Sequence, residues 1–189
     1  MRTLIAVPCM DDVKADFNLS MVALRKPNCE YIQARSSLIY DARNRLAEIA
    51  CNRGFDKVLW LDSDMVLEPD TVERMLDAGD YDYLTAVYPT RVEPIKPVVY
   101  EEMEIGKDPV SFELIPNEIF EIAGSGMGCV LMNTKIIYEV AKAFDRPFSP
   151  ILGLGEDLSF CYRLTALGKK MHCDGRIRVG HVGTKVYKL

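Results

Sequence analysis

The sequence predicts an α/β fold in which a mostly parallel central sheet lies between layers of helices. Short apolar runs alternate with helical stretches along the 189 residues, which is typical of β-α-β units. The run Lys57–Leu61 (KVLWL) has the continuous apolar character of a strand that is covered on both faces. We expect one domain spanning residues 1–189, because no repeat, linker or low-complexity segment divides the chain.

The first half of the chain is predicted to contain four strands and two helices. Strands are expected at residues 4–7, which Pro8 stops, at 30–33 after a polar segment, at 57–61 and at 83–88. Ser36 or Ser37 caps a helix that runs to about Asn52 and ends at Gly54. Pro69 suits the first turn of the second helix. The residues expected to be buried on these two helices are Ile39, Ala42, Leu46, Ile49 and Ala50, then Val72, Met75 and Leu76.

The second half begins with a segment that prolines break. Residues 89–122 are rich in acidic residues and predict short strands and loops, which we interpret as a small antiparallel appendage. A glycine-rich stretch, 124–128, leads into a strand at 129–132, and Thr134 caps a helix that ends near Phe144. A last helix begins at Glu156 and ends before Gly168, followed by strands at 171–173 and 177–179. The buried face predicted for that helix is Leu158, Cys161, Tyr162 and Thr165.

Composition and charge exclude several classes of function. Asp and Glu number 28 against 23 Lys and Arg, so the net charge is −5 and no overall positive field favours a nucleic-acid partner. No apolar run approaches the length of a membrane span, and the start MRTLIAVPCMDD lacks the core of a signal peptide, so we expect a cytoplasmic protein. The six cysteines are widely spaced, without a CxxC pair, which favours reduced core thiols over a zinc site.

Asp62 and Asp64 follow the strand at 57–61 directly. Residues two apart in an extended segment point to the same side, so both carboxylates can face one divalent cation and the phosphates bound to it. Hard oxygen ligands favour Mg²⁺ or Mn²⁺. The alternative is a turn held by side chain to backbone bonds, although the position at the end of a buried strand favours a functional role.

Other nucleotide and metal motifs do not account for this pair. A dehalogenase-type motif follows the first strand and continues with threonine, whereas this one lies mid-chain and is followed by Met65. The sixth position of an EF-hand loop requires glycine, and Leu67 occupies it. Neither GxGxxG nor GxxxxGK[ST] occurs, so the Rossmann dinucleotide site and the P-loop lack their usual support.

Two later positions carry side chains that can act as a general base or as a metal ligand. Glu156 and Asp157 stand at a predicted helix start after a loop rich in glycine and proline, where a carboxylate can act as a general base. The competing interpretation is that the two acids only complement the helix dipole. His181, between Gly180 and Gly183, can complete a metal site or can be a hydrogen-bonded tail histidine.

The order and spacing of these groups resemble those of the GT-A fold glycosyltransferases, most closely an inverting, metal-dependent, family 2-like group. The matching blocks are DARNRLAEIACNRGFDKVLWLDSDMVLEPDTVERML, GSGMGCVLMNTKII and GEDLSFCYRLTALGKKMHCDGRIRVGH, which cover 41–76 and 124–181. The resemblance implies a Rossmann-like three-layer sandwich. It also implies transfer of a hexose from a nucleoside diphosphate sugar, with UDP the expected nucleotide, to an acceptor hydroxyl.

The resemblance also assigns roles to residues. Asp62 and Asp64 hold a Mn²⁺ or Mg²⁺ ion on the donor diphosphate, and His181 is the remaining metal ligand. Asp157 is the base, and Glu156 orients the substrate. The residues that contact substrate are Pro8, Cys9, Arg43, Asp62, Gly126, Met127 and Gly128. An ordinary exposed helix residue is the alternative for Arg43.

Two other functions stay open on the sequence. A sugar-phosphate nucleotidylyltransferase has a related fold, but the opening segment lacks the glycine-rich loop with lysine or arginine that handles a triphosphate. A module that binds a nucleotide sugar without turning it over is the other. The chain departs from the family pattern as well, since Leu158-Ser159-Phe160 replaces the tryptophan-bearing extension of the ED motif.

Overall fold

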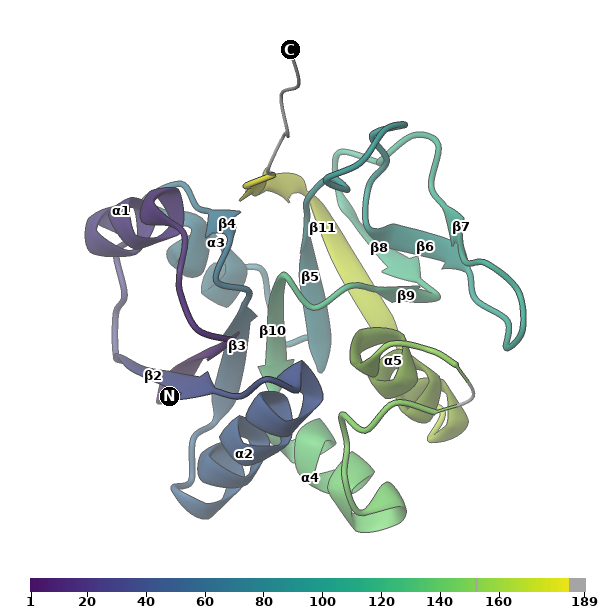
Figure 1. Ribbon diagram of the computed structural model, residues 1–189, viewed down its shortest axis with the longest axis horizontal. Helices are drawn as coiled ribbons and strands as arrows, with labels where there is room; N and C mark the ends of the chain where they lie inside the picture. The colour runs from purple at the N-terminus through teal and green to yellow at the C-terminus, as the bar shows by residue number, and fades with distance from the viewer. Residues whose placement is uncertain (152, 184–189) are drawn as a thin grey trace.

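The computed structural model describes residues 1–151 and 153–183. The main sheet has the strand order β2-β1-β3-β10-β5-β11-β8 (Figure 1). Its strands are β1 (Thr3–Cys9), β2 (Cys29–Arg35), β3 (Lys57–Leu61), β5 (Tyr83–Val87), β8 (Ile119–Ile122), β10 (Cys129–Asn133) and β11 (Met171–Arg178). β10 and β8 run antiparallel to their neighbours, and the other pairs are parallel. The prediction of an α/β fold with a mostly parallel sheet is therefore confirmed.

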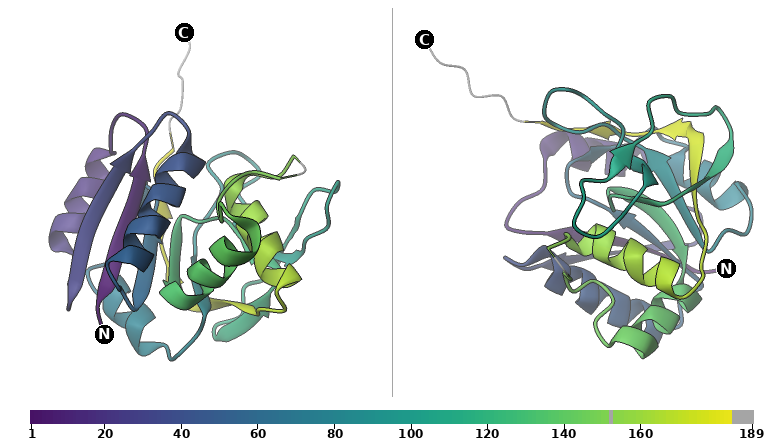
Figure 2. Two further views of the ribbon diagram at one scale, coloured as in Figure 1. Left: turned by 90° about the horizontal axis from the view of Figure 1, so that it is seen from below. Right: turned by 90° about the vertical axis from the view of Figure 1, so that its right-hand side faces the viewer.

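Helices cover both faces of this sheet. α2 (Ile39–Asn52), α4 (Thr134–Phe144) and α5 (Glu156–Ala166) lie on one face, and α1 (Ala15–Ala23) and α3 (Thr71–Asp77) lie on the other (Figures 1 and 2). Strand β3 alternates between the two cores, with Val58 and Trp60 packed in the first and Leu59 and Leu61 in the second. A strand buried on both faces explains the apolar run that the sequence shows there.

Two small sheets complete the structure. β6 (Val99–Glu102) pairs antiparallel with β7 (Val110–Ser111) and with β9 (Gly124–Ser125), which confirms a small antiparallel appendage. Its bounds differ from the predicted 89–122, because β8 joins the main sheet and β9 lies beyond that range. β4 (Met65–Val66) pairs with β12 (Gly180–His181). This second pairing brings the C-terminal part of the chain to the segment that follows Asp64.

Helix α1 is the main element that the sequence analysis missed, since a polar segment was expected there. Phe17, Met21 and Leu24 are buried at helical spacing, but Leu19 and Val22 are well exposed between them. Because apolar residues occur on both faces of α1, the sequence shows no clean apolar stripe at this point.

Several predicted helix boundaries and faces are wrong. The N-cap of α2 is Leu38, and Ser36 instead accepts a hydrogen bond from the Leu38 amide. Asn133 rather than Thr134 is the N-cap of α4. The buried face of α5 includes Phe160, Cys161 and Leu164, whereas Tyr162 and Thr165 are exposed.

Other expectations are met or need smaller corrections. Gly54 and Gly168 adopt positive φ angles of 66° and 67° just beyond α2 and α5, as predicted for helix ends. The two last strands form one strand, β11, with a register shift between Asp174 and Arg178. All six cysteines are free thiols, four of them buried. No helix within residues 1–151 and 153–183 is long and apolar enough to cross a membrane.

Candidate active site

The carboxyl ends of the parallel strands form one edge of the main sheet, and a pocket of about 580 Å³ opens there. Because β10 is antiparallel, its amino end reaches the same edge. The pocket is lined by Pro8, Cys9, Met10, Asp12, Lys14, Ile39, Arg43, Asp62, Ser63, Asp64, Tyr88, Thr90, Arg91, Val92, Val98, Met127, Glu156, Asp157 and His181. It therefore gathers every site residue predicted from the sequence except Gly126 and Gly128.

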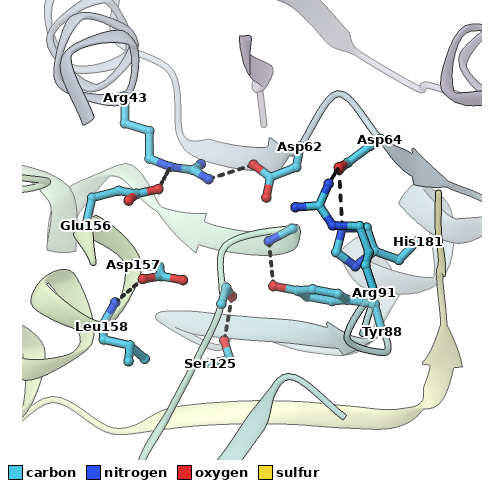
Figure 3. Close-up of polar contacts among 12 residues, drawn as sticks. Arg43, Asp62, Asp64, Tyr88, Arg91, Ser125, Glu156, Asp157, Leu158 and His181 are labelled. Atoms are coloured by element: carbon cyan, nitrogen blue, oxygen red, sulfur yellow. Dashed lines mark hydrogen bonds and ion pairs between the residues drawn. The ribbon is translucent and has the colours of Figure 1, made fainter. Parts of the chain in front are cut away.

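The two aspartates after β3 point to different partners. Asp62 Oδ1 accepts a hydrogen bond from Arg43 Nη2 at 2.6 Å, and Asp64 Oδ2 accepts one from Arg91 Nη1 at 2.6 Å (Figure 3). The Asp62 amide bonds to the Gly128 carbonyl at 3.0 Å, which ties the start of the turn to the glycine-rich stretch. The carboxylates are therefore held by separate cationic groups.

Arg43 is a buried connector between two segments that are distant in sequence. Its side chain is 2 % exposed, and its Nε donates to Glu156 Oε1 at 3.2 Å while Nη2 reaches Asp62. The guanidinium also lies over the Trp60 ring, 5.7 Å from the centroid. The interpretation of Arg43 as an exposed helix residue is wrong. It lines the pocket, and Nη1 has no hydrogen-bond partner among the described residues.

His181 reaches the pocket through the β4–β12 pairing, which sets it opposite Met65. The Val182 amide donates to the Asp64 carbonyl at 2.9 Å, so the two backbones are joined beside the carboxylate. His181 Nδ1 lies 2.8 Å from the Pro89 carbonyl, and Nε2 lies 3.5 Å from Asp64 Oδ2. Since a carbonyl only accepts, Nδ1 carries a proton and Nε2 faces the carboxylate.

The Asp64–His181 pair shifts the acidity of both groups. Burial lowers the pKa of His181, but the hydrogen bonds to Asp64 and the Pro89 carbonyl outweigh it and the pKa is raised. Burial raises the pKa of Asp64, but the interactions with His181 and Arg91 outweigh it and the pKa is lowered. Both shifts favour the charged forms of Asp64 and His181.

The geometry fits a divalent cation in part. An imidazole whose Nδ1 bonds to a carbonyl presents Nε2 as a metal ligand, and here Nε2 and a carboxylate oxygen face the same point. Asp62 does not join them, because its carboxylate turns to Arg43. Within the described part of the chain, no group of three or more His, Cys, Asp and Glu side chains is arranged to hold a metal ion. A cation at Asp64 and His181 would need its remaining ligands from a bound phosphate or water.

Asp157 lies at the other end of the pocket, in the first turn of α5. Burial raises its pKa to about 6, and the neighbouring charge of Glu156 adds to the shift. One carboxylate oxygen, Oδ1, accepts a hydrogen bond from the Leu158 amide at 2.7 Å. A carboxylate with this pKa is ionised near neutral pH and is a stronger base than an ordinary aspartate.

The glycine-rich stretch is shaped around Tyr88. The Gly128 amide donates to Tyr88 Oη at 3.0 Å, and a Cβ on Gly126 would lie 2.1 Å from the same oxygen. Met127 is the residue of this stretch that lines the pocket. Gly126 and Gly128 thus allow the ring to pack behind the pocket wall, and their contact with a substrate stays a prediction.

Tyr88 and Arg91 are two of the pocket residues that the sequence does not identify as functional, and the others are Met10, Asp12, Lys14, Ile39, Ser63, Thr90, Val92 and Val98. Tyr88 ends a predicted strand beside the acid motif, and that position was a usable signal. Arg91 lies in the proline-rich segment that was interpreted only as the start of the appendage. Nothing in its local sequence indicates that it contacts Asp64.

Comparisons with known proteins find similarity at the level of structure. No family model matches the sequence, and no curated protein matches it. A solved structure described as A197 from STIV has a TM-score of 0.67 at 19% identity, over 97% of this chain and 87% of that chain. The structure of GalNAc-T7 with UDP, GalNAc and Mn²⁺ has a TM-score of 0.70 at 11% identity, over 96% of this chain and 44% of that one.

A third similar structure is the inositol-1-phosphate CTP transferase from T. maritima. Its TM-score is 0.54 at 12% identity, over 97% of this chain and 90% of that chain. Identities this low show a shared fold and not a shared activity. The chain has a GT-A-like α/β fold, of the kind found in structures of a glycosyltransferase and of a nucleotidyltransferase.

Proposed function

We propose that residues 1–189 form one catalytic domain, a glycosyltransferase that moves a hexose from a nucleoside diphosphate sugar to an acceptor hydroxyl. UDP is the expected nucleotide. The observation that carries the proposal is the convergence of Asp64, His181 and Asp157 on one pocket from three distant parts of the sequence. A volume of about 580 Å³ is within the usual range for small-ligand sites.

The two ends of the pocket suit two tasks. Asp64 and His181 would hold Mn²⁺ or Mg²⁺, which supplies positive charge where the diphosphate leaving group becomes more negative. Pro8 and Cys9, at the end of β1, are proposed to seat the nucleotide base. Arg43 links Asp62 to Glu156 at the start of α5 by hydrogen bonds to both carboxylates.

Asp157 is proposed as the general base. It takes the proton of the acceptor hydroxyl while that oxygen attacks the anomeric carbon, and the bond to the diphosphate breaks with its electron pair on the leaving oxygen. Attack from the face opposite the diphosphate inverts the configuration. Glu156 is held by Arg43 and is proposed to orient the substrate beside this carboxylate.

The pKa of Asp157 makes the proposal testable by pH. Because the base must be ionised, turnover should rise about tenfold per pH unit below pH 6 and level off above it. We expect Mn²⁺-dependent hydrolysis of UDP-glucose or UDP-galactose, measured by UDP release, and a loss of at least about 100-fold in Asp157→Asn with UDP affinity kept. The matched control is Asp77→Asn, an exposed carboxylate at the end of α3. Equal turnover in the two variants would remove Asp157 from the role of base.

Nucleotidyl transfer is the second candidate, favoured by the similarity to the inositol-1-phosphate CTP transferase. It predicts that CTP or UTP with a sugar phosphate releases pyrophosphate, whereas a glycosyltransferase releases a nucleoside diphosphate from a preformed nucleotide sugar. A product assay with both substrate sets separates them. UDP binding without either product would indicate a binding module.

A further inference from the structure

Arg91 occupies the position beside Asp64 where a cation is proposed to bind. Its Nη1 lies 2.6 Å from Asp64 Oδ2, and His181 Nε2 lies 3.5 Å from the same oxygen (Figure 3). The Arg91 side chain is 51 % exposed, while that of Asp64 is 16 % exposed. The arginine therefore approaches a sheltered carboxylate from the solvent side.

Arg91 differs from the other arginine of the pocket in its exposure and in the number of carboxylates it bonds to. The carboxylates lining it are Asp12, Asp62, Asp64, Glu156 and Asp157. Of the two arginines there, Arg43 is buried and divided between Asp62 and Glu156. Asp64 is the hydrogen-bond partner of the Arg91 side chain among the described residues, so most of its donors are available to an anion.

Hydrogen bonds hold the backbone beside Arg91, and the Arg91 side chain is half-exposed. The Thr90 amide donates to the Lys96 carbonyl at 2.8 Å, and the Lys96 amide donates to Thr90 Oγ1 at 3.1 Å. His181 Nδ1 donates to the Pro89 carbonyl at 2.8 Å, so the base of the loop is also tied to the proposed metal ligand. The loop tip, residues 91–96, is exposed. A change of partner by Arg91 would leave these backbone bonds in place.

A divalent cation and a guanidinium on one carboxylate repel each other across a short gap, so the binding of one weakens the binding of the other. A released guanidinium has a planar fork of N–H donors that matches two phosphate oxygens. The pocket that Arg91 lines is the one proposed to hold a diphosphate.

We propose that Arg91 and a divalent cation exclude each other at Asp64, and that cation binding transfers the Arg91 guanidinium to the phosphate oxygens of the bound nucleotide. This inference rests on the proposed function for its ligands. Arg91 acts in it as an internal counter-ion when the pocket is empty and as a ligand-binding residue when the pocket is filled. Because of this exchange, binding of the cation increases the affinity for the nucleoside diphosphate, and binding of the nucleoside diphosphate increases the affinity for the cation.

The test measures two affinities in the same variants. Mn²⁺ binding without nucleotide is measured by isothermal titration calorimetry, and UDP binding is measured at saturating Mn²⁺. Arg91→Ala should bind Mn²⁺ about three- to tenfold more tightly, because the competing cation is gone, and UDP about tenfold more weakly. The matched control is Arg25→Ala, which removes a similarly exposed arginine paired with Glu73 at 2.5 Å and should change neither affinity.

Opposite signs of the two effects are the signature of exchange. Mn²⁺ affinity that is unchanged or weaker in Arg91→Ala overturns the competition, and unchanged UDP affinity overturns the transfer to phosphate. If no variant binds Mn²⁺, with or without UDP, the inference fails together with the cation in the proposed function. If both affinities shift as expected and no sugar is transferred, the proposed reaction fails and the inference stands. A melting curve for Arg91→Ala confirms that this surface variant is folded.

Discussion

The acid motif has two halves that differ in the burial of their partners. Asp62 is held by Arg43, a guanidinium enclosed among Trp60, Glu156 and the sheet, whereas Asp64 is held by Arg91 at the surface. The same hydrogen-bond length, 2.6 Å, occurs in both. Equal distances do not imply equal contributions to stability, because burial and exposure change what an ion pair contributes. Burial fixes the inner pair as part of the fold, and exposure leaves the outer pair exchangeable.

Replacing each of the two arginines by alanine tests most directly whether the two ion pairs differ in their contribution to stability. Arg43→Ala removes a buried side chain and leaves the partly buried carboxylates of Asp62 and Glu156 without a counter-ion, so it should lower the free energy of unfolding by about 3–5 kcal/mol. Arg91→Ala should change it by less than about 1 kcal/mol. Urea unfolding measures both. Arg43→Lys keeps a charge but loses the fork, so it should fold with an intermediate loss. Similar losses for both alanine variants would contradict the role of burial in fixing the inner pair.

Tyr88 contacts two parts of the site. Its Oη accepts a hydrogen bond from the Gly128 amide, and its ring packs edge-on against the His181 ring, with 5.5 Å between the ring centroids. Gly126→Ala should cost about 1–3 kcal/mol of stability, since the new Cβ would lie 2.1 Å from Tyr88 Oη. Tyr88→Phe removes that oxygen, so the same substitution should cost less in this background. A double-mutant cycle measures the coupling.

Gly54→Ala serves as the control in that cycle. Gly54 has a positive φ angle of 66° and open space around its Cα. Its substitution therefore costs conformational energy that Tyr88→Phe should not relieve. An equal rescue at both glycines would show that the ring does not set the shape of the stretch.

Asp157 gives the smallest expected effect, and it tests through pH a carboxylate whose charge interacts with Arg43 and Asp62. Its pKa of about 6 in the folded chain is above the ordinary 3.8, so the folded state binds the proton more tightly. The stabilisation is complete below about pH 4 and is lost as pH rises through 6. Asp157→Asn should therefore raise the free energy of unfolding by about 1–2 kcal/mol at pH 7.5 and give no gain near pH 4. Asp77→Asn should show no such trend, and a gain for Asp157→Asn that persists at pH 4 would exclude the buried charge of Asp157 as its cause.

Much of the fold can be predicted from the sequence, because buried strands and helices carry simple patterns of apolar residues. Strand β3 and helix α2 were predicted nearly as they are, since one is continuously apolar and the other carries a regular stripe. Helix α1 was missed because exposed Leu19 and Val22 blur its buried face. In α5, Tyr162 and Thr165 fit the expected period but lie on the solvent side, and the packing of Phe160 and Leu164 decides the orientation.

The residues that line the pocket could be predicted in part from the sequence, but the directions and partners of their side chains could not. The sequence analysis grouped Asp62, Asp64, Asp157 and His181 as candidate site residues, and all four line one pocket. The direction of each carboxylate depends on long-range partners, such as Arg43 for Asp62 and Arg91 for Asp64, which no local pattern reveals. The role of the glycines in seating Tyr88 likewise appears only when β5 and the glycine-rich stretch are placed together.

The pairing of β12 with β4 has a consequence for biosynthesis. A nascent chain emerges from the ribosome with its N-terminus first, so the aspartate motif is available for folding more than a hundred residues before the histidine that faces it. β11, which lies inside the main sheet, is also late. We expect the pocket to be the last part of the molecule to take shape, so that a chain stalled before residue 180 carries the acids without their imidazole.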